Sequence, residues 1–215
     1  MMRTSHITHG IFVLSMCLLT ACTSVKNMSF VQDIPQGTAL PTRPEFIIET
    51  GDLLNVSVQS LNGSASDLFN TGYNYVVDVD GVITMPVLGK VAVGGKTLEQ
   101  AKILIASLIA DKVQNAFVSM SFTAATLSIL GEVNTPQKIY TAQPITIWEA
   151  IGTANGLTTN ARYNKIEVLR TKNNQITKYI LDLTSPELIQ SPCYYLMKGD
   201  VVNVLPKYRT LTYKH

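Results

Sequence analysis

Two short segments of this chain combine a helix-start signal with helical spacing, and short apolar runs separated by turn residues fill much of the remainder. Thr97 with Gln100, and Thr146 with Glu149, have the spacing of a capping box, in which each side chain bonds the other residue's backbone N–H. Apolar residues after Thr97 recur at helical spacing over residues 98–109. The pattern predicts an α+β chain built from two small units, each with one helix.

Strand and turn signals surround these two helices. An Asp80-Gly81 pair lies between alternating apolar runs at residues 75–79 and 82–85, and it predicts a hairpin because both residues tolerate positive φ. Gly156 suits a left-handed end to the second helix. Further strands are expected at residues 46–48, 53–58, 116–123, 126–132, 165–170, 176–183 and 201–205.

One six-residue pattern occurs twice. Gly51-Asp52 and Gly199-Asp200 are each followed by two apolar residues, an asparagine and a valine. Two copies are too few for a repeat architecture. We therefore expect two turns of the same geometry, one opening the first unit and one ending the second, with both glycines at positive φ.

The N-terminus has the pattern of an export signal. Arg3 precedes an apolar run at residues 11–19, which is too short to cross a bilayer. The run ends in LTAC, which resembles the bacterial lipobox, so cleavage between Ala21 and Cys22 would free Cys22 for acylation. An ordinary signal peptide with an incidental cysteine is the alternative, and Cys17 is a weaker candidate because a bulky methionine precedes it.

Acylation of Cys22 with several chains would hold the mature protein stably on a membrane. Thr23 and Ser24 follow the cysteine, so the aspartate that typically retains such lipoproteins in the inner membrane is absent. We therefore expect an outer-membrane protein that faces the periplasm. Residues 22–44 contain three prolines and little periodicity, as a tether would.

The composition excludes several classes of function. The chain is 46% hydrophobic and 15% charged with a formal net charge of +2, so it should fold and has no electrostatic reason to bind nucleic acid. The three histidines lie at positions 6, 9 and 215, outside the folded body, which argues against a histidine metal site or a histidine-activated nucleophile. We expect no enzyme activity, no cofactor and no metal. Cys193 should be a buried apolar residue rather than a reactive thiol.

Two weaker patterns have simple explanations. Gly94-Gly95 precedes the first helix but lacks the glycine spacing of a phosphate-binding loop, so a turn is expected there. The stretch at residues 162–178 is rich in arginine and lysine, and the solvated face of a hairpin explains it. A surface for an acidic partner, such as an anionic glycan, is the alternative.

In their order, the motifs resemble those of the bacterial outer-membrane polysaccharide export lipoproteins of the Wza type. In the first unit the resemblance rests on Gly51, Asp52, Asp80, Gly81, Pro86 and Gly89. In the second, which is similar to the family's SLBB β-grasp domain, it rests on Gly131, Glu132, Pro136, Gly156, Gly199 and Asp200. Gln137 and Asn155 depart from this pattern, since the family usually has glycine at both places.

The resemblance implies a small polysaccharide-export α/β domain followed by a β-grasp (SLBB-like) domain. We expect a signal peptide at residues 1–21, a lipidated tether at 22–44, the export domain at 45–124, the SLBB-like domain at 125–206 and a tail at 207–215. Nine residues follow Pro206 and would reach only about 14 Å as a helix, so we expect no membrane-spanning helix from them.

The resemblance also implies a function, as a component of an exopolysaccharide or capsular polysaccharide export complex. Head-to-tail contacts between copies would close a homo-oligomeric ring around the polysaccharide. An outer-membrane barrel protein and an inner-membrane copolymerase would be its partners. A tethered periplasmic glycan-binding adaptor or sensor, which forms no conduit, is the alternative.

Overall fold

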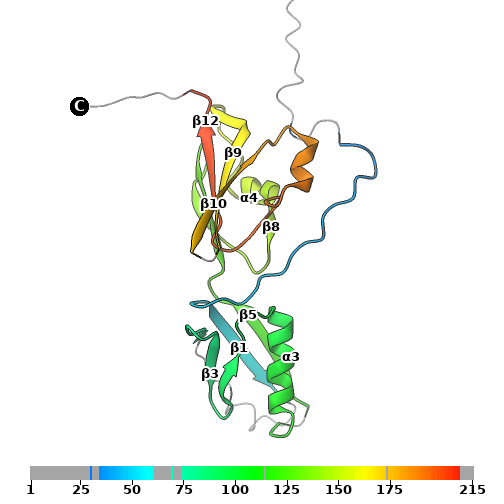
Figure 1. Cartoon of the computed structure of the whole chain (residues 1–215), viewed down its shortest axis with the longest axis vertical. Coiled ribbons are helices and arrows are strands. Elements are labelled where there is room, and N and C mark those ends of the chain that lie inside the picture. The colour runs from blue at the N-terminus through cyan, green and yellow to red at the C-terminus, as the bar shows by residue number, and fades with distance from the viewer. Residues whose placement is uncertain are drawn as a thin grey trace, which may run out of the picture.

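The structure is a computed structural model that describes residues 30, 34–60, 69, 74–113, 115–172 and 174–208. These residues form two units stacked along the long axis of the molecule (Figure 1). The predicted signal peptide at 1–21, the cleavage site between Ala21 and Cys22, the lipidation site and residues 209–215 of the tail lie outside the described residues, as does most of the tether up to residue 33.

The first unit contains a three-stranded antiparallel sheet with the strand order β2-β1-β5. The strands are β1 (Leu53–Gln59), β2 (Asn74–Val76) and β5 (Phe117–Phe122). A separate hairpin joins β3 (Val82–Met85) to β4 (Gly89–Ala92), and helix α3 spans Leu98–Ile109.

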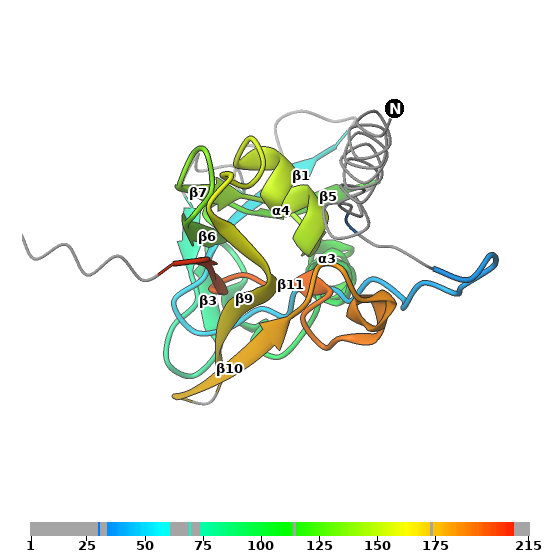
Figure 2. The same ribbon diagram turned by 90° about the horizontal axis from the view of Figure 1, so that it is seen from above.

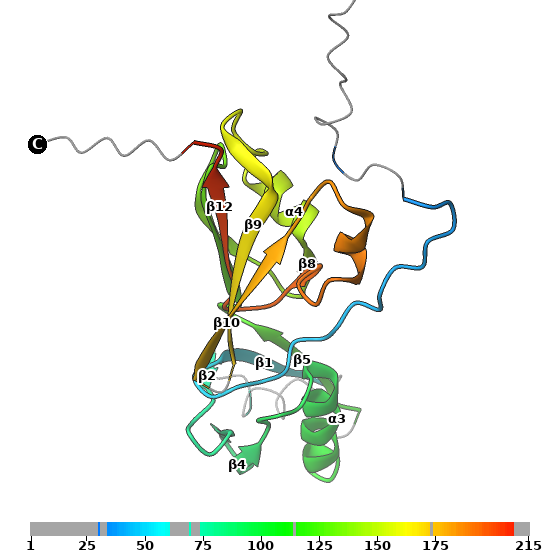
Figure 3. The same cartoon turned by 45° about the horizontal axis from the view of Figure 1, so that its top comes forward.

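Helix α3 covers one face of this sheet, which is where the first hydrophobic core lies. Its buried residues Ala101, Ile105 and Ile109 belong to the same core as the alternate residues Leu54 and Val56 of β1. In Figure 3, α3 and β4 lie on one side of β1 and β5. The capping box predicted at the start of α3 is confirmed, with both reciprocal hydrogen bonds present.

The second unit contains a five-stranded mixed sheet with the order β10-β9-β12-β6-β7. Strands β12 and β6 are parallel and the other neighbours are antiparallel. The strands are β6 (Thr126–Gly131), β7 (Gln137–Tyr140), β9 (Ala161–Lys172), β10 (Gln175–Leu181) and β12 (Val201–Pro206). In Figure 2, β10 lies at the edge of this sheet, beside β9.

Shorter elements complete the second unit and its core. They are the strand pair β8 (Ile145–Thr146) and β11 (Tyr195–Leu196), helix α4 (Ile147–Thr153) and the 3₁₀ helix η3 (Pro186–Gln190). Residues of α4 share one core with the alternate residues of the sheet. The second capping box is confirmed, and the chain leaves α4 through left-handed Asn155 (φ 58°) and Gly156 (φ 83°). The α+β fold class is likewise confirmed.

Two local predictions for the first unit are wrong. Asp80-Gly81 does form a turn, but β2 pairs with β1 rather than with β3, so the predicted hairpin does not form. Pairing with β1 buries Tyr75 in the core, and β3 pairs instead with β4. The strand expected at residues 46–48 is reduced to a single bridge between Ile47 and Thr97.

Candidate functional site at the junction of the two units

The two Gly-Asp turns have the same geometry. Gly51 and Gly199 have φ angles of +86° and +83°, and a Cβ at either would meet no atom within 4 Å, so the backbone angle alone favours glycine. Each aspartate N–H donates to the carbonyl three residues earlier, at 3.1 Å in both turns. The carboxylates of Asp52 and Asp200 accept the N–H of those same earlier residues, at 2.7 and 2.8 Å. The sequence repeat therefore specifies one turn structure twice.

Lys198, which precedes Gly199, connects the second turn to the first. Its ammonium group forms an ion pair with the carboxylate of Asp52, and it lies 3.3 Å from Oε2 of Glu49. The same nitrogen lies 4.9 Å from the ring centroid of Phe122 at the end of β5. The side chains of Lys198 and Asp52 are only 12% and 18% exposed, so this contact is largely shielded from solvent.

Asp200 of the second turn is bound inside its own unit. It is 1% exposed, the most buried charged residue that the structure describes. Arg170 on β9 donates to it from Nε at 2.9 Å and from Nη2 at 2.6 Å, and also donates to the carbonyls of Pro192 and Tyr195 at 3.1 Å each. Burial alone would lower the pKa of Arg170, but the hydrogen bond to Asp200 and its charge raise it.

The position of Arg170 corrects one sequence prediction. The stretch at residues 162–178 was expected to be a solvated face, but Arg170 points into the second unit, where it binds Asp200. Lys178 does fit the expectation, because it is exposed and lies 3.4 Å from Oε1 of Glu167 on the neighbouring strand. The stretch is therefore only partly a solvent-facing surface.

Cys193 lies beside this buried ion pair. Its side chain is buried and forms no disulfide, as predicted for a buried apolar cysteine. Burial raises the pKa of the thiol to about 11, although the positive charge of Arg170 acts in the opposite direction. The thiol is therefore neutral near pH 7 and is a poor nucleophile there.

The chain that enters the first unit also contacts the second. Residues 34–46 contain no helix or strand, and Figure 1 shows this blue segment descending beside the second unit. Arg43 lies 3.8 Å from Glu149 of α4 and 5.6 Å from the ring centroid of Tyr195. Phe46 is buried and packs edge-on against Phe122, with 5.8 Å between ring centroids. This segment therefore ties the two units together on a second side.

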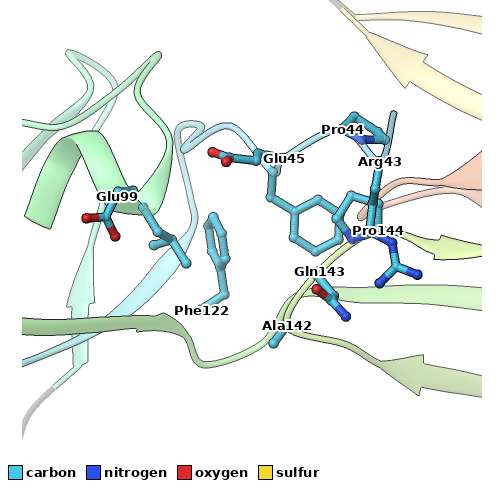
Figure 4. A pocket seen from close by; sticks show the side chains of 10 residues that line it. Arg43, Pro44, Glu45, Glu99, Phe122, Ala142, Gln143 and Pro144 are labelled. Carbon is cyan, nitrogen blue, oxygen red and sulfur yellow. The ribbon is translucent and has the colours of Figure 1, made fainter. Parts of the chain in front are cut away.

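Two cavities are lined in part by this segment. The first, of about 300 Å³, is lined by its residues 43–46, by the start of α3, by Phe122 and by the loop before β8. Figure 4 shows Glu45 and Glu99 on one side of Phe122, and Arg43 with Gln143 on the other. The second, of about 460 Å³, is lined by Arg170, Lys198 and Tyr195 among others.

Carboxylates, an amide and cations line the two cavities. Among the residues that the structure describes, no cluster of three or more His, Cys, Asp or Glu side chains could hold a metal ion.

Several predicted motif residues meet at a corner of the second unit. A Cβ on Gly131 (φ 84°) would lie 2.2 Å from the carbonyl oxygen of Val204, so this position requires glycine. The carboxylate of Glu132 accepts hydrogen bonds from Thr158 Oγ1 at 2.6 Å and from Asn160 Nδ2 at 3.3 Å. These contacts fix the end of β6 against β12 and the chain before β9.

The segment around Pro136 is hydrogen-bonded to the end of α4 and to the residues that follow it. The N–H of Asn134 donates to the carbonyl of Gly156 at 3.0 Å. Gln137 Nε2 donates to the carbonyl of Thr153 at 2.7 Å. The departure from glycine at position 137 therefore supplies a hydrogen bond to the last residue of the helix.

The remaining motif residues shape the hairpin region of the first unit. Asp78 accepts the N–H groups of Asp80 and Val82 at 3.0 and 2.8 Å. Gly81 approaches Gly94 so closely that a Cβ on Gly94 would lie 2.7 Å from the Cα of Gly81. This close backbone contact explains the glycine at position 94, in the stretch that was compared with a phosphate-binding loop. Pro86 and Gly89 form the turn between β3 and β4, where Gly89 has a φ of 70°.

The structure therefore brings only some of the predicted residues together. Asp52 reaches the second unit through Lys198, the residue before the Gly199-Asp200 turn, whereas the other motif residues make contacts within their own units. Sequence reasoning missed Lys198 and Arg43 as contacts between the units. The sequence does contain one signal for Lys198. The two copies of the repeat differ at the residue before the glycine, which is a threonine in the first copy and Lys198 in the second.

Comparison with known proteins assigns both units. Residues 40–123 match the family model described as "Polysaccharide biosynthesis/export protein". Residues 126–204 match the family model of the SLBB domain. Within the described residues, no helix is both long and apolar enough to cross a membrane.

Two curated relatives carry the same printed name, "EPS I polysaccharide export outer membrane protein EpsA". The protein from Ralstonia nicotianae is 30% identical over 192 residues, which cover 78% of this chain and 49% of the relative. The protein from Ralstonia solanacearum is 29% identical over 185 residues, which cover 74% of this chain and 48% of the relative. The chain thus spans about half the length of the curated relatives it matches.

Proposed function

Because this chain belongs to the Wza-type polysaccharide export proteins that carry an SLBB domain, we propose that it is the outer-membrane component of an exopolysaccharide or capsular polysaccharide export complex. The observation that carries the proposal is the order of the two matched domains. The proposed division is an export domain at residues 45–124 and an SLBB-like domain at 125–206. The role is transport without catalysis.

The anchor is the second part of the proposal. Cys22, freed by cleavage after Ala21, carries the lipid, and the folded body faces the periplasm. Cys22→Ala should release the protein from the outer-membrane fraction and abolish incorporation of labelled fatty acid. Cys17→Ala is the matched control and should change neither. If labelling persists in Cys22→Ala, or disappears in Cys17→Ala, the anchor is placed wrongly.

Assembly is the third part. Copies of the chain associate head-to-tail into a closed ring, since a heterologous contact whose rotation closes produces a ring rather than a filament. A protein in the outer membrane supplies the exit and an inner-membrane copolymerase docks from the periplasmic side. Electron microscopy of the detergent-extracted lipoprotein should show rings. A monomer that binds glycan would favour the adaptor function instead.

The export role itself is tested in a strain that lacks this chain. That strain should still synthesise the polymer but should accumulate it as lipid-linked or periplasmic material. Surface polysaccharide should return when the wild-type chain is supplied on a plasmid. Unchanged surface polysaccharide in the deletion strain, under conditions that induce capsule or biofilm, would refute the export role.

A further inference from the structure

The outer face of the sheet β2-β1-β5, opposite α3, has a centre of hydroxyl and amide side chains. Asn55 and Ser57 of β1 lie directly across from Ser121 and Ser119 of β5, and Asn74 of β2 lies across from Asn55. All five are exposed or half-buried. In the part of the chain that the structure describes, α3 and the β3–β4 hairpin lie on the other side of the sheet (Figure 3). We call these five residues the neutral face.

Among the described residues of these three strands, exposed apolar side chains lie at the two ends of the neutral face. Val76, 59% exposed, is paired with Leu53 at one end, and Phe117, 63% exposed, is paired with Gln59 at the other. The ends are about 20 Å apart along β1. A protein–protein interface has the opposite layout, with an apolar centre and a polar rim.

The outer positions of these three strands also lack charge. Their sequences, LLNVSVQ, NYV and FVSMSF, contain no acidic or basic residue. The charged side chains of the unit lie elsewhere, such as Lys90 on β4 and Glu99 and Lys102 on α3. A surface strip of this length without charge needs a reason, because charges are common elsewhere on the unit.

We propose that the neutral face is the surface over which the exported polysaccharide strand passes. This inference rests on the proposed function and assigns the polymer contact within it. Serine hydroxyls and asparagine amides both donate and accept hydrogen bonds, as sugar hydroxyls do. Conduction requires contacts that are numerous but weak, so that the cargo can leave as readily as it enters. A fixed charge in the centre would instead hold or repel charged groups of the polymer.

The open face of the second unit's sheet supports this assignment by contrast. The outward residues of its edge strand include the exposed Ile176 and Ile180, with Lys178 between them, and Lys178 pairs with Glu167 of β9. The centre of the neutral face has neither exposed apolar residues nor a charged pair. The two open faces therefore differ in the chemistry of what they can bind.

A photo-crosslinking residue placed on the neutral face tests the contact directly. The full-length lipoprotein with a benzophenone side chain at Ser119 is expressed in the deletion strain and irradiated while the strain exports its own polysaccharide. The control carries benzophenone at Ser107, an exposed serine on α3. We expect a glycan-stained adduct at position 119 that is at least about fivefold stronger than at position 107. An adduct between two copies of the chain at 119, or no adduct, overturns the proposal.

Charge substitutions provide a second readout. Ser119→Glu and Ser119→Lys should each lower surface polysaccharide about fivefold, the ratio that an ionic contact of about 1 kcal/mol produces. Ser107→Glu and Ser107→Lys should leave it unchanged, and thermal unfolding checks that all four variants fold. Normal export by both Ser119 variants overturns the neutral face as the polymer surface. Normal export by the deletion strain would instead refute the proposed function, so the two failures are distinguishable.

Discussion

The two Gly-Asp turns share one backbone geometry but differ in the cation that each aspartate binds. Asp200 is fully buried and receives two hydrogen bonds from Arg170 of the same unit. Asp52 is partly exposed and binds Lys198, which belongs to the other unit. The same six-residue pattern therefore stabilises the interior of one unit in one copy and the junction between units in the other.

This difference shows what a short motif can specify. The Gly-Asp pair determines the turn and the orientation of its carboxylate, because the backbone N–H three residues earlier binds that carboxylate in both copies. The partner of the carboxylate is determined by the surrounding fold. The contribution of each ion pair should follow its burial, and the following substitutions test this from the largest expected effect to the smallest.

Removing the buried cation should have the largest effect. Arg170→Ala leaves the carboxylate of Asp200 buried without its partner, which should lower the free energy of unfolding by about 3 kcal/mol. Denaturant unfolding of the full chain measures this. Lys178→Ala removes an exposed cation from the neighbouring strand and should cost less than about 1 kcal/mol. Equal costs for the two variants would contradict the interior role of Arg170.

Cys193 should make the interior ion-pair region sensitive to alkaline pH. Its pKa is about 11 in the fold, above the ordinary value of 9.0 for the unfolded chain. Between these values the unfolded chain loses the thiol proton and the native state retains it, so stability falls as pH rises from 9 to 11, by about 2 kcal/mol. Cys193→Ala should remove this part of the pH dependence. If stability falls with pH between 9 and 11 equally in Cys193→Ala and in the wild type, the thiol is in contact with water.

The two turn glycines should respond alike, which tests whether the turns are equivalent. Gly51→Ala and Gly199→Ala should each cost about 1 kcal/mol, because both need positive φ and neither is crowded by neighbouring atoms. Gly152→Ala, in α4 with open space around the added methyl group, is the control and should stabilise or be neutral. If the losses in unfolding free energy of Gly51→Ala and Gly199→Ala differ by more than about 1 kcal/mol, the two turns are not equivalent.

Neutralising Lys198 should have the smallest effect on overall stability. Lys198→Gln should cost about 0.5 kcal/mol, because the Asp52 carboxylate that loses its partner is 18% exposed, against 1% for Asp200, so water can solvate it. The effect should decrease in concentrated salt, which screens the ion pair in the wild type. Lys138→Gln, which replaces an exposed lysine on β7, is the control. A cost equal to that of Arg170→Ala would contradict the conclusion that the cost follows the burial of the aspartate.

The sequence predicted most of the secondary structure because the signals were local. Both helices begin at the predicted capping boxes, and the strands after residues 52 and 200 follow the Gly-Asp turns that the sequence marks. The hairpin around Asp80 was predicted wrongly because strand pairing is a long-range choice. There, β2 buries Tyr75 by pairing with β1, and no local signal records this.

The junction was predictable only in its parts. The repeat predicted both turns, but Lys198 and Asp52 are 146 residues apart, and their contact depends on how two separately folded cores are placed. Arg170 was misassigned for a related reason, since a basic stretch on a hairpin does not reveal which strand face each residue occupies until the sheet register is known.

The junction is tested most directly by the distance between two spin labels, one in each unit. Labels at Ser107→Cys in α3 and Thr177→Cys in β10 occupy exposed positions, and the native Cys193 is buried. Pulsed electron spin resonance should give one narrow distance distribution for the otherwise wild-type chain and a broader one when Lys198→Gln is added. A distribution that is broad in both proteins, or equally narrow in both, would contradict the conclusion that Lys198 and Asp52 hold the two units in one arrangement.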